Sequence, residues 1–141
     1  MRLLYLITRA EPGGAQVHLL ELLRGFRDRA ELHLGVGEDQ DGFLVEEARA
    51  LGVRVHLLRH LVQPVRPVKD FRGLFEVMAL LRKVRPHLLH AHSSKAGFLG
   101  RLAGRALGVK SVFTAHGWAF TDGVPEGMKR LALSMERLAG R

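Results

Sequence analysis

Short apolar segments alternate with amphipathic segments throughout these 141 residues, and this alternation restricts the fold more than any other feature. We expect strands over 2–8, 31–36, 54–58, 88–91 and 111–115, and helices over 15–27, 43–51, 71–84, 96–107 and 126–138. Residues 3–7 are continuously apolar, which is typical of a strand covered on both faces of a parallel sheet. The alternation therefore predicts a doubly wound, Rossmann-like α/β sheet, most simply in strand order 3-2-1-4-5 with helices on both faces.

Prolines and a possible cap limit the third expected helix. Pro64 and Pro67 exclude a regular helix over 59–69, because proline lacks the backbone N–H that a helix interior needs. Asp70 is the expected N-cap of helix 71–84.

The helix over 96–107 contains an unusual number of glycines. Gly97, Gly100 and Gly104 lie on adjacent turns, although each glycine costs a helix about 1 kcal/mol relative to alanine. We therefore expect this helix to approach the sheet closely. Gly108 is its expected end, as Gly52 is for helix 43–51.

Length and composition indicate one globular domain over residues 1–141. The absence of cysteine excludes a disulfide framework and a thiolate metal site.

The net charge of +8 favours anionic partners such as phosphate groups, an acidic lipid surface or nucleic acid. Nucleic acid is the weakest of these, because the chain has one Trp, one Tyr and no recognisable nucleic-acid motif. The first apolar run is too short for a signal peptide or a membrane span, so we expect a cytoplasmic protein.

Three polar loops meet at one edge in the expected strand order. They cover residues 8–14, 92–95 and 116–122, and each follows the carboxyl end of a strand. Ligands of open α/β sheets bind at this edge. In the first loop, Gly13 and Gly14 precede a helix. Their backbone N–H groups can approach an anion closely at the start of that helix. The alternative is that they form an ordinary tight turn between the strand and the helix.

The second loop carries the imidazoles, hydroxyls and ammonium of the expected site. His90 and His92 share a face of the strand; we expect His90 in the core and His92 facing solvent and substrate. A zinc site formed with His116 is a weaker alternative. Ser93 or Ser94 caps the following helix. Lys95 is either an anion clamp or a solvated surface lysine, since the dipole of a helix start disfavours a cation.

The third loop places Trp118 beside Gly117 and His116. We expect the His116 side chain to face solvent and substrate. The aromatic ring there either stacks on a sugar or base, or closes the end of the sheet. The basic helix over 126–138 either covers the core or lies on an acidic membrane.

Three motifs together resemble a known family. PGGAQVH at 12–18, HAHSSKAGFLGRLAGR at 90–105 and FTAHGWAFTDG at 113–123 are similar, in this order, to the N-terminal domain of retaining family-four glycosyltransferases of the GT-B fold. Within that family the resemblance is greatest to bacterial enzymes of polysaccharide and lipopolysaccharide assembly. It implies transfer of a sugar from a nucleotide-sugar to a saccharide or lipid-linked acceptor, with retained configuration and without a metal or other cofactor.

The resemblance also implies roles for individual residues. Gly13 and Gly14 would approach the donor diphosphate, and His116 would act at the reaction centre against the transferred sugar. Gly117 and Trp118 would belong to the sugar-contact loop. The acceptor side would be lined by His92, Ser93, Ser94 and Lys95. No general base is evident, and in the family's proposed front-face mechanism the donor phosphate takes the acceptor proton.

The family's donor-binding C-terminal domain, with its paired-glutamate E-x7-E motif, has no counterpart in these 141 residues. We therefore expect the acceptor-side half of a GT-B enzyme, which folds alone, transfers no sugar and self-associates through an exposed cleft wall. We also expect peripheral contact with the inner face of the membrane. The alternative is a non-catalytic Rossmann-type module that binds a phosphorylated small molecule or an anionic lipid.

Overall fold

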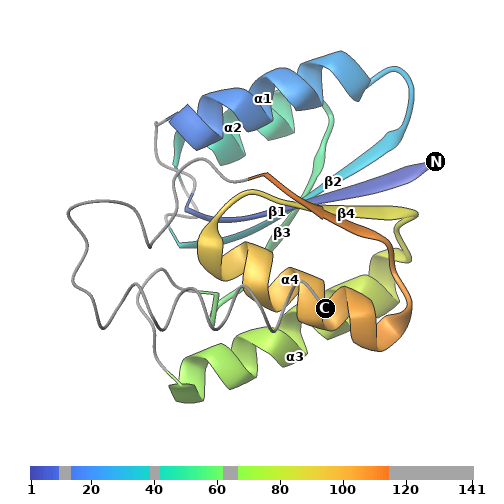
Figure 1. The fold of residues 1–141 in the computed structure, drawn as a ribbon. Coiled ribbons are helices and arrows are strands. Elements are labelled where there is room, and N and C mark those ends of the chain that lie inside the picture. The colour runs from blue at the N-terminus through green and yellow to red at the C-terminus, as the bar shows by residue number, and fades with distance from the viewer. Residues whose placement is uncertain (10–13, 39–41, 62–66, 115–141) are drawn as a thin grey trace.

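A parallel sheet lies between two layers of helices in the computed structural model, which describes residues 1–9, 14–38, 42–61 and 67–114 (Figure 1). The strands are β1 (Arg2–Arg9), β2 (Glu31–Glu38), β3 (Arg54–Leu57), β4 (Leu88–Ala91) and β5 (Ser111–Phe113). The helices are α1 (Gly14–Phe26), α2 (Phe43–Ala50), α3 (Pro67–Val84) and α4 (Ser94–Leu107). All neighbouring strands are parallel, in the order β3-β2-β1-β4-β5. The predicted topology is confirmed.

The central strand β1 explains why its sequence is continuously apolar. Leu3, Tyr5 and Ile7 pack on one face in the core beneath α1 and α2. Leu4 and Leu6 pack on the other face in the core beneath α3 and α4. Because successive side chains of a strand point to opposite faces, a strand covered on both sides has no position for an exposed polar residue.

The limits of α4 follow the predicted caps. Ser93 is the N-cap, and its side-chain oxygen accepts a hydrogen bond from the backbone N–H of Ala96 at 3.3 Å. Gly108 ends the helix in the left-handed conformation, with φ of 71°. Both ends satisfy backbone groups that the helix itself leaves open.

The glycines of α4 lie against the sheet, as predicted. A Cβ added at Gly97 would lie 2.6 Å from the Phe113 ring, and one at Gly100 would lie 3.2 Å from methyl groups of Leu6 and Leu89. These distances leave no room for a side chain at Gly97 without movement of the partly buried Phe113 ring. Helix α4 is therefore held close to β1, β4 and β5.

The prediction for the start of α3 is wrong. The helix begins at Pro67 rather than at residue 71, so Asp70 lies within its first turn and is not the N-cap. Proline is tolerated at the first helical position, because the N–H it lacks would have no partner inside the helix. We expected Pro67 to exclude a helix at this position, but Pro67 is the first residue of α3.

Several smaller differences concern strand ends and residues beyond the described ranges. Strand β2 continues to Glu38, and β5 is assigned only as far as Phe113. The predicted loop over 116–122 and the predicted helix over 126–138 lie outside the described residues. Within the described ranges, no helix combines the length and apolarity that crossing a membrane requires.

Candidate functional site

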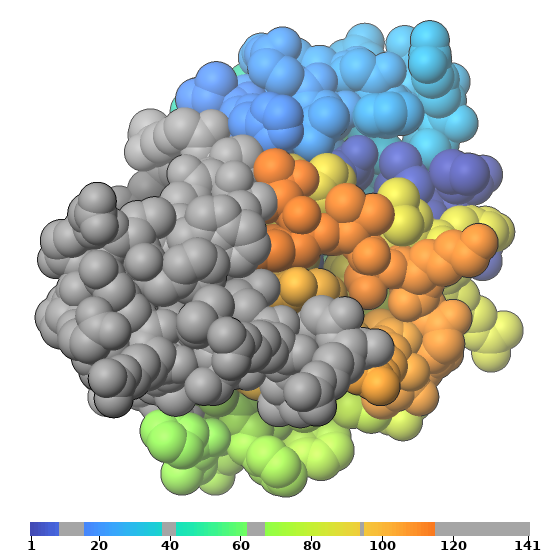
Figure 2. Space-filling view, in the orientation of Figure 1, coloured from blue at the N-terminus to red at the C-terminus, as the bar shows by residue number. Residues whose placement is uncertain are grey.

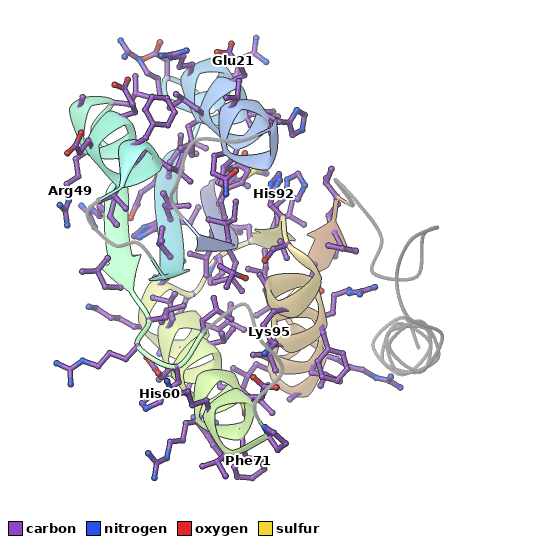
Figure 3. The ribbon with its side chains drawn as sticks, turned by 90° about the vertical axis from the view of Figure 1, so that its left-hand side faces the viewer. Glu21, Arg49, His60, Phe71, His92 and Lys95 are labelled. Atoms are coloured by element: carbon purple, nitrogen blue, oxygen red, sulfur yellow. The ribbon has the colours of Figure 1, made fainter. Side chains whose placement is uncertain are left out.

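The carboxyl ends of β1 and β4 are joined to the start of α4 by one serine. The Ser93 hydroxyl oxygen accepts a hydrogen bond from the Thr8 backbone N–H at 3.3 Å and lies 2.5 Å from the Thr8 hydroxyl. The backbone N–H of His92 donates to the Leu6 carbonyl at 2.9 Å, which prolongs the strand pairing. Thr8 is fully buried. These bonds bring the first and second predicted loops to one place, the edge that faces the viewer in Figure 3.

Four rings gather on the α1 side of this edge. The ring centroids of His90 and His92 are 4.1 Å apart, and the Tyr5 ring lies 5.5 Å from His90 and 5.9 Å from His92. The exposed His18 of α1 lies 5.9 Å from His92. As predicted, His90 and His92 share a face. The edge therefore holds a ring cluster in which Tyr5 and His92 are buried, His90 is half-buried and His18 is exposed.

The predicted exposure of the two histidines is reversed. His92 is 1% exposed, although we expected it to face solvent, and His90 is half-buried, although we expected it in the core. His92 is covered because α1 passes over the end of β4 on this face (Figure 3). His90 lies beside β5, and its Nε2 atom is 2.6 Å from the Thr114 hydroxyl.

Tyr5 contributes a hydroxyl that stays protonated. Burial raises the pKa of its phenol above the ordinary 10.0, because the buried environment disfavours the phenolate. At neutral pH this side chain is therefore a neutral ring with a hydrogen-bond donor.

Lys95 lies on the other side of the sheet and forms an ion pair with Asp70 of α3. The Lys95 side chain is 4% exposed and that of Asp70 is 16% exposed. The interpretation of Lys95 as a solvated surface lysine is therefore wrong. The early start of α3 causes the pairing, since it places Asp70 in the first turn, opposite the start of α4. An anion that binds Lys95 has to share it with Asp70 or displace it.

The chain leaving β5 is held at the same edge. The Thr114 backbone N–H donates to the Ala91 carbonyl at 3.0 Å, and the Thr114 hydroxyl contacts His90. The next residues include the predicted His116, Gly117 and Trp118, which lie outside the described residues, as does Gly13. Gly14 and Ser94 are the first residues of α1 and α4, respectively.

Among the described residues, no group of three or more histidine, cysteine, aspartate or glutamate side chains is arranged to hold a metal ion. The zinc alternative requires His116, which is beyond the described ranges.

From the sequence we did not predict Tyr5, His18 or Asp70 as members of this edge, whereas Thr8 belongs to the predicted first loop. The alternation of faces along residues 2–8 contains a usable signal, because it places Tyr5 on the same face as Leu3 and Ile7. No local pattern pairs Asp70 with Lys95, since the two residues belong to different helices.

Comparisons with known proteins agree with this architecture. The sequence matches the glycosyl transferase 4-like domain family over residues 13–141. It is 31% identical over 137 residues to the UDP-Gal:alpha-D-GlcNAc-diphosphoundecaprenol alpha-1,3-galactosyltransferase of Escherichia coli, covering 90% of this chain and 35% of that protein. It is 26% identical over 115 residues to the O-antigen biosynthesis glycosyltransferase WbnH of Escherichia coli, covering 82% of this chain and 32% of that protein.

Solved structures show the same fold at low sequence identity. Anabaena HepE in complex with UDP gives a TM-score of 0.72 at 21% identity, covering 96% of this chain and 35% of that one. MurG of Acinetobacter baumannii gives 0.67 at 13% identity, covering 96% and 39%. The chain spans about a third of the length of the curated relatives it matches. The family match and the sheet topology together show that this chain belongs to the glycosyl transferase 4-like domain family and is an N-terminal domain of the GT-B type.

Proposed function

We propose that this chain is the acceptor-side domain of a retaining glycosyltransferase, which moves a sugar from a nucleotide-sugar to a saccharide attached to a lipid diphosphate. The observation that carries the proposal is the joining of β1, β4 and α4 through Ser93 and Thr8. This connection joins the end of β1, which precedes the first family motif, to the second motif, and Thr114 brings the start of the third motif to the same edge.

The chemistry of the edge suits a saccharide acceptor. Sugar rings pack their C–H faces on aromatic surfaces, and the exposed His18 and the half-buried His90 offer such rings on the α1 side. The helix start after Ser93 and the Lys95 ammonium favour an anionic group such as a diphosphate. The similarity to an enzyme whose name specifies a GlcNAc-diphosphoundecaprenol acceptor supports the same acceptor class here.

The remaining site roles are part of the same proposal. His92, Ser93, Ser94 and Lys95 form the acceptor side, Gly13 and Gly14 approach the donor diphosphate, and Gly117 and Trp118 touch the sugar. His116 contacts the transferred sugar at the reaction centre. In this mechanism the donor phosphate accepts the proton of the attacking hydroxyl on the same face. The donor's other contacts belong to a second domain, so residues 1–141 alone bind acceptor and transfer nothing.

A calorimetric titration tests the acceptor assignment. The probes are GlcNAc-diphosphate joined to a short, soluble prenyl chain, and UDP-galactose. We expect the acceptor analogue to bind the 141-residue chain and UDP-galactose to bind far more weakly. Loss of one ring contact in His18→Ala weakens binding of the acceptor analogue up to about tenfold. The matched control is His87→Ala, because His87 is an exposed histidine next to the opposite end of β4.

Three outcomes contradict the proposal. Equal binding of the acceptor analogue by wild type and His18→Ala removes the α1 side of the edge from the acceptor site. Equal loss in His87→Ala and His18→Ala shows that histidine removal acts non-specifically. Turnover of UDP-galactose by the isolated chain refutes the assignment as an inactive acceptor-side half.

A further inference from the structure

We propose that the amino edge of the sheet binds an acidic segment of a partner protein. The amino edge is the border formed by the starts of strands β1 to β5 and the last turns of helices α1 to α4. It lies on the right-hand side of Figure 1, where α1, α3 and α4 end. A partner bound there leaves the opposite, carboxyl edge open. This inference goes beyond the proposed function, since it requires neither sugar nor nucleotide.

A surface pocket of about 190 Å³ opens at the amino edge. It lies between the ends of α1 and α2 and the starts of β2 and β3. Leu32 and Val53, each 5% exposed, and the half-buried Leu51 supply its apolar lining. Pockets for drug-sized ligands have volumes of about 300–1,000 Å³, so this one suits a single side chain better than a nucleotide.

The charged groups of the pocket are mainly basic. Two exposed arginines, Arg27 and Arg54, line it together with one carboxylate, that of Glu31. The Glu31 Oε1 atom is already engaged, at 2.8 Å from His33 Nε2 and 3.4 Å from Arg54 Nη1. Arg27 has only a loose contact at 3.9 Å with Asp28, whose side chain is 91% exposed. The pocket therefore suits a ligand that offers a carboxylate next to an apolar side chain.

The surroundings of the pocket are basic as well. Arg29, Arg85 and Lys110 are exposed at the amino edge and form no ion pair with any residue that the structure describes. The helix dipole favours cations in a last turn, which accounts for Arg82 and Arg105. Arg29 and Lys110 lie beyond the helix ends, so the dipole does not account for them. Figure 2 shows this border on the right, with the start of β1 and the segments leading into β4 and β5 at its surface.

This combination fits an acidic protein segment better than a nucleic acid or a bilayer. In a protein interface one apolar side chain anchored in a pocket supplies much of the affinity, while complementary charges around it steer the partner. Nucleic-acid surfaces use aromatic rings on which bases stack, and none of the residues that line this pocket is aromatic. A bilayer offers no protruding side chain to fill it.

An NMR titration of the isotope-labelled chain at low salt tests the proposal. The probe is a blocked pentapeptide in which one leucine is flanked on each side by two glutamates. We expect shift changes concentrated at the backbone amides of residues 30–32 and 51–54, which line the pocket. Replacing the leucine with serine weakens binding about tenfold, because burial of its side chain is lost. Replacing the glutamates with glutamines, or adding salt, removes most of the binding, because exposed charge pairs are lost or screened.

Matched double variants locate the binding. In Arg27→Gln/Arg54→Gln we expect the affinity for the peptide to fall about fivefold, since two exposed charge pairs are removed. The control is Arg59→Gln/Arg72→Gln, which removes the same charge from exposed positions away from the amino edge and should bind the peptide like wild type.

Four outcomes overturn the proposal. These are equal loss of affinity in the two double variants, the absence of shift changes at the pocket, equal binding of the serine and leucine peptides, and tighter binding of a thymidine oligonucleotide of matched charge at the same amides. The acceptor analogue should bind Arg27→Gln/Arg54→Gln like wild type, because both arginines lie at the amino edge. That titration separates failure here from failure of the proposed function.

Discussion

The two faces of the sheet treat neighbouring polar residues differently at the carboxyl edge. On the α1 face, His92 is buried among the rings of Tyr5, His18 and His90. On the α3–α4 face, Lys95 pairs with Asp70. Only two serines separate His92 from Lys95 in the sequence, yet a layer of sheet lies between their side chains (Figure 3). On the α1 face the polar side chain of His92 is therefore accommodated by packing against other rings. On the α3–α4 face the Lys95 ammonium is accommodated by the ion pair with Asp70.

This difference changes how the proposed acceptor site works. The residues from His92 to Lys95 look like one continuous binding surface in the sequence. In the structure they form a rim whose α1 side offers ring surfaces and whose α3–α4 side offers an ion pair. We infer that a sugar contacts the first side and that a diphosphate competes with Asp70 on the second.

The largest expected effect comes from breaking the ion pair. Lys95→Met leaves the Asp70 carboxylate poorly solvated without its partner, and breaking a buried pair in this way costs about 3–5 kcal/mol. On the other face, His92→Phe keeps a ring of similar size in place and is expected to cost less than about 1.5 kcal/mol. Urea unfolding followed by circular dichroism measures both.

The double variant Lys95→Met/Asp70→Leu is the control for this comparison. It removes both charges and is expected to recover much of the lost stability. The proposed difference between the two faces is contradicted if Lys95→Met lowers the free energy of unfolding by no more than His92→Phe does.

A smaller effect is expected from the helices that cover the two faces. In Gly97→Ala the new methyl group meets the Phe113 ring, and the overpacking costs about 1–3 kcal/mol. The matched substitution is Gly25→Ala in α1, where a Cβ meets nothing within 4 Å and the better helix propensity adds up to about 1 kcal/mol. Opposite signs in urea unfolding confirm that α4, and not the end of α1, is in close contact. A stabilising Gly97→Ala would contradict this.

The smallest effect concerns pH and a histidine on the α3 side of the sheet. Burial, followed by the charges of His33, Lys83 and Arg54, holds the pKa of His56 below its ordinary 6.5. The unfolded chain then binds more protons than the folded chain as the pH falls below that value, so the stability from this group is present above it and is lost on acidification. Wild type should lose Tm between about pH 7.5 and about pH 5.5, which spans the ordinary histidine pKa.

His56→Gln should lose less Tm than wild type over the same interval. Glu31, which hydrogen-bonds His33 at 2.8 Å, also has a lowered pKa, chiefly because of that bond. Its stabilising contribution is lost only as the pH falls below its ordinary value of 4.5, so it does not contribute within the interval. Identical acid sensitivity in wild type and His56→Gln would contradict the assignment.

Most of the described fold was predictable, because local patterns carried it. The apolar runs located the five strands, and the doubly wound arrangement of five strand–helix units gave their order. Ser93 and Gly108 marked the ends of α4 through ordinary capping chemistry. The start of α3 was mispredicted because of Pro67. A proline inside a helix breaks it, whereas a proline at the first helical position is favourable. The sequence alone does not distinguish these two positions.

The candidate site was less predictable than the fold. That the loops after β1 and β4 meet follows from topology alone, and the structure agrees. Whether a side chain at the edge is covered depends on what packs over it. The position of α1 above β4 buries His92, and the first turn of α3 supplies the partner of Lys95.

The sequence by itself determined the order of strands and helices, the two-sided burial of β1 and the edge at which polar residues gather, because these depend on hydrophobic period and chain direction. Only the tertiary structure decided that His92 is buried, that Lys95 is neutralised by Asp70, and that Val68, Phe71 and Phe75 are exposed. Burial and pairing are set by contacts between segments far apart in the chain, and no local pattern encodes which segments meet.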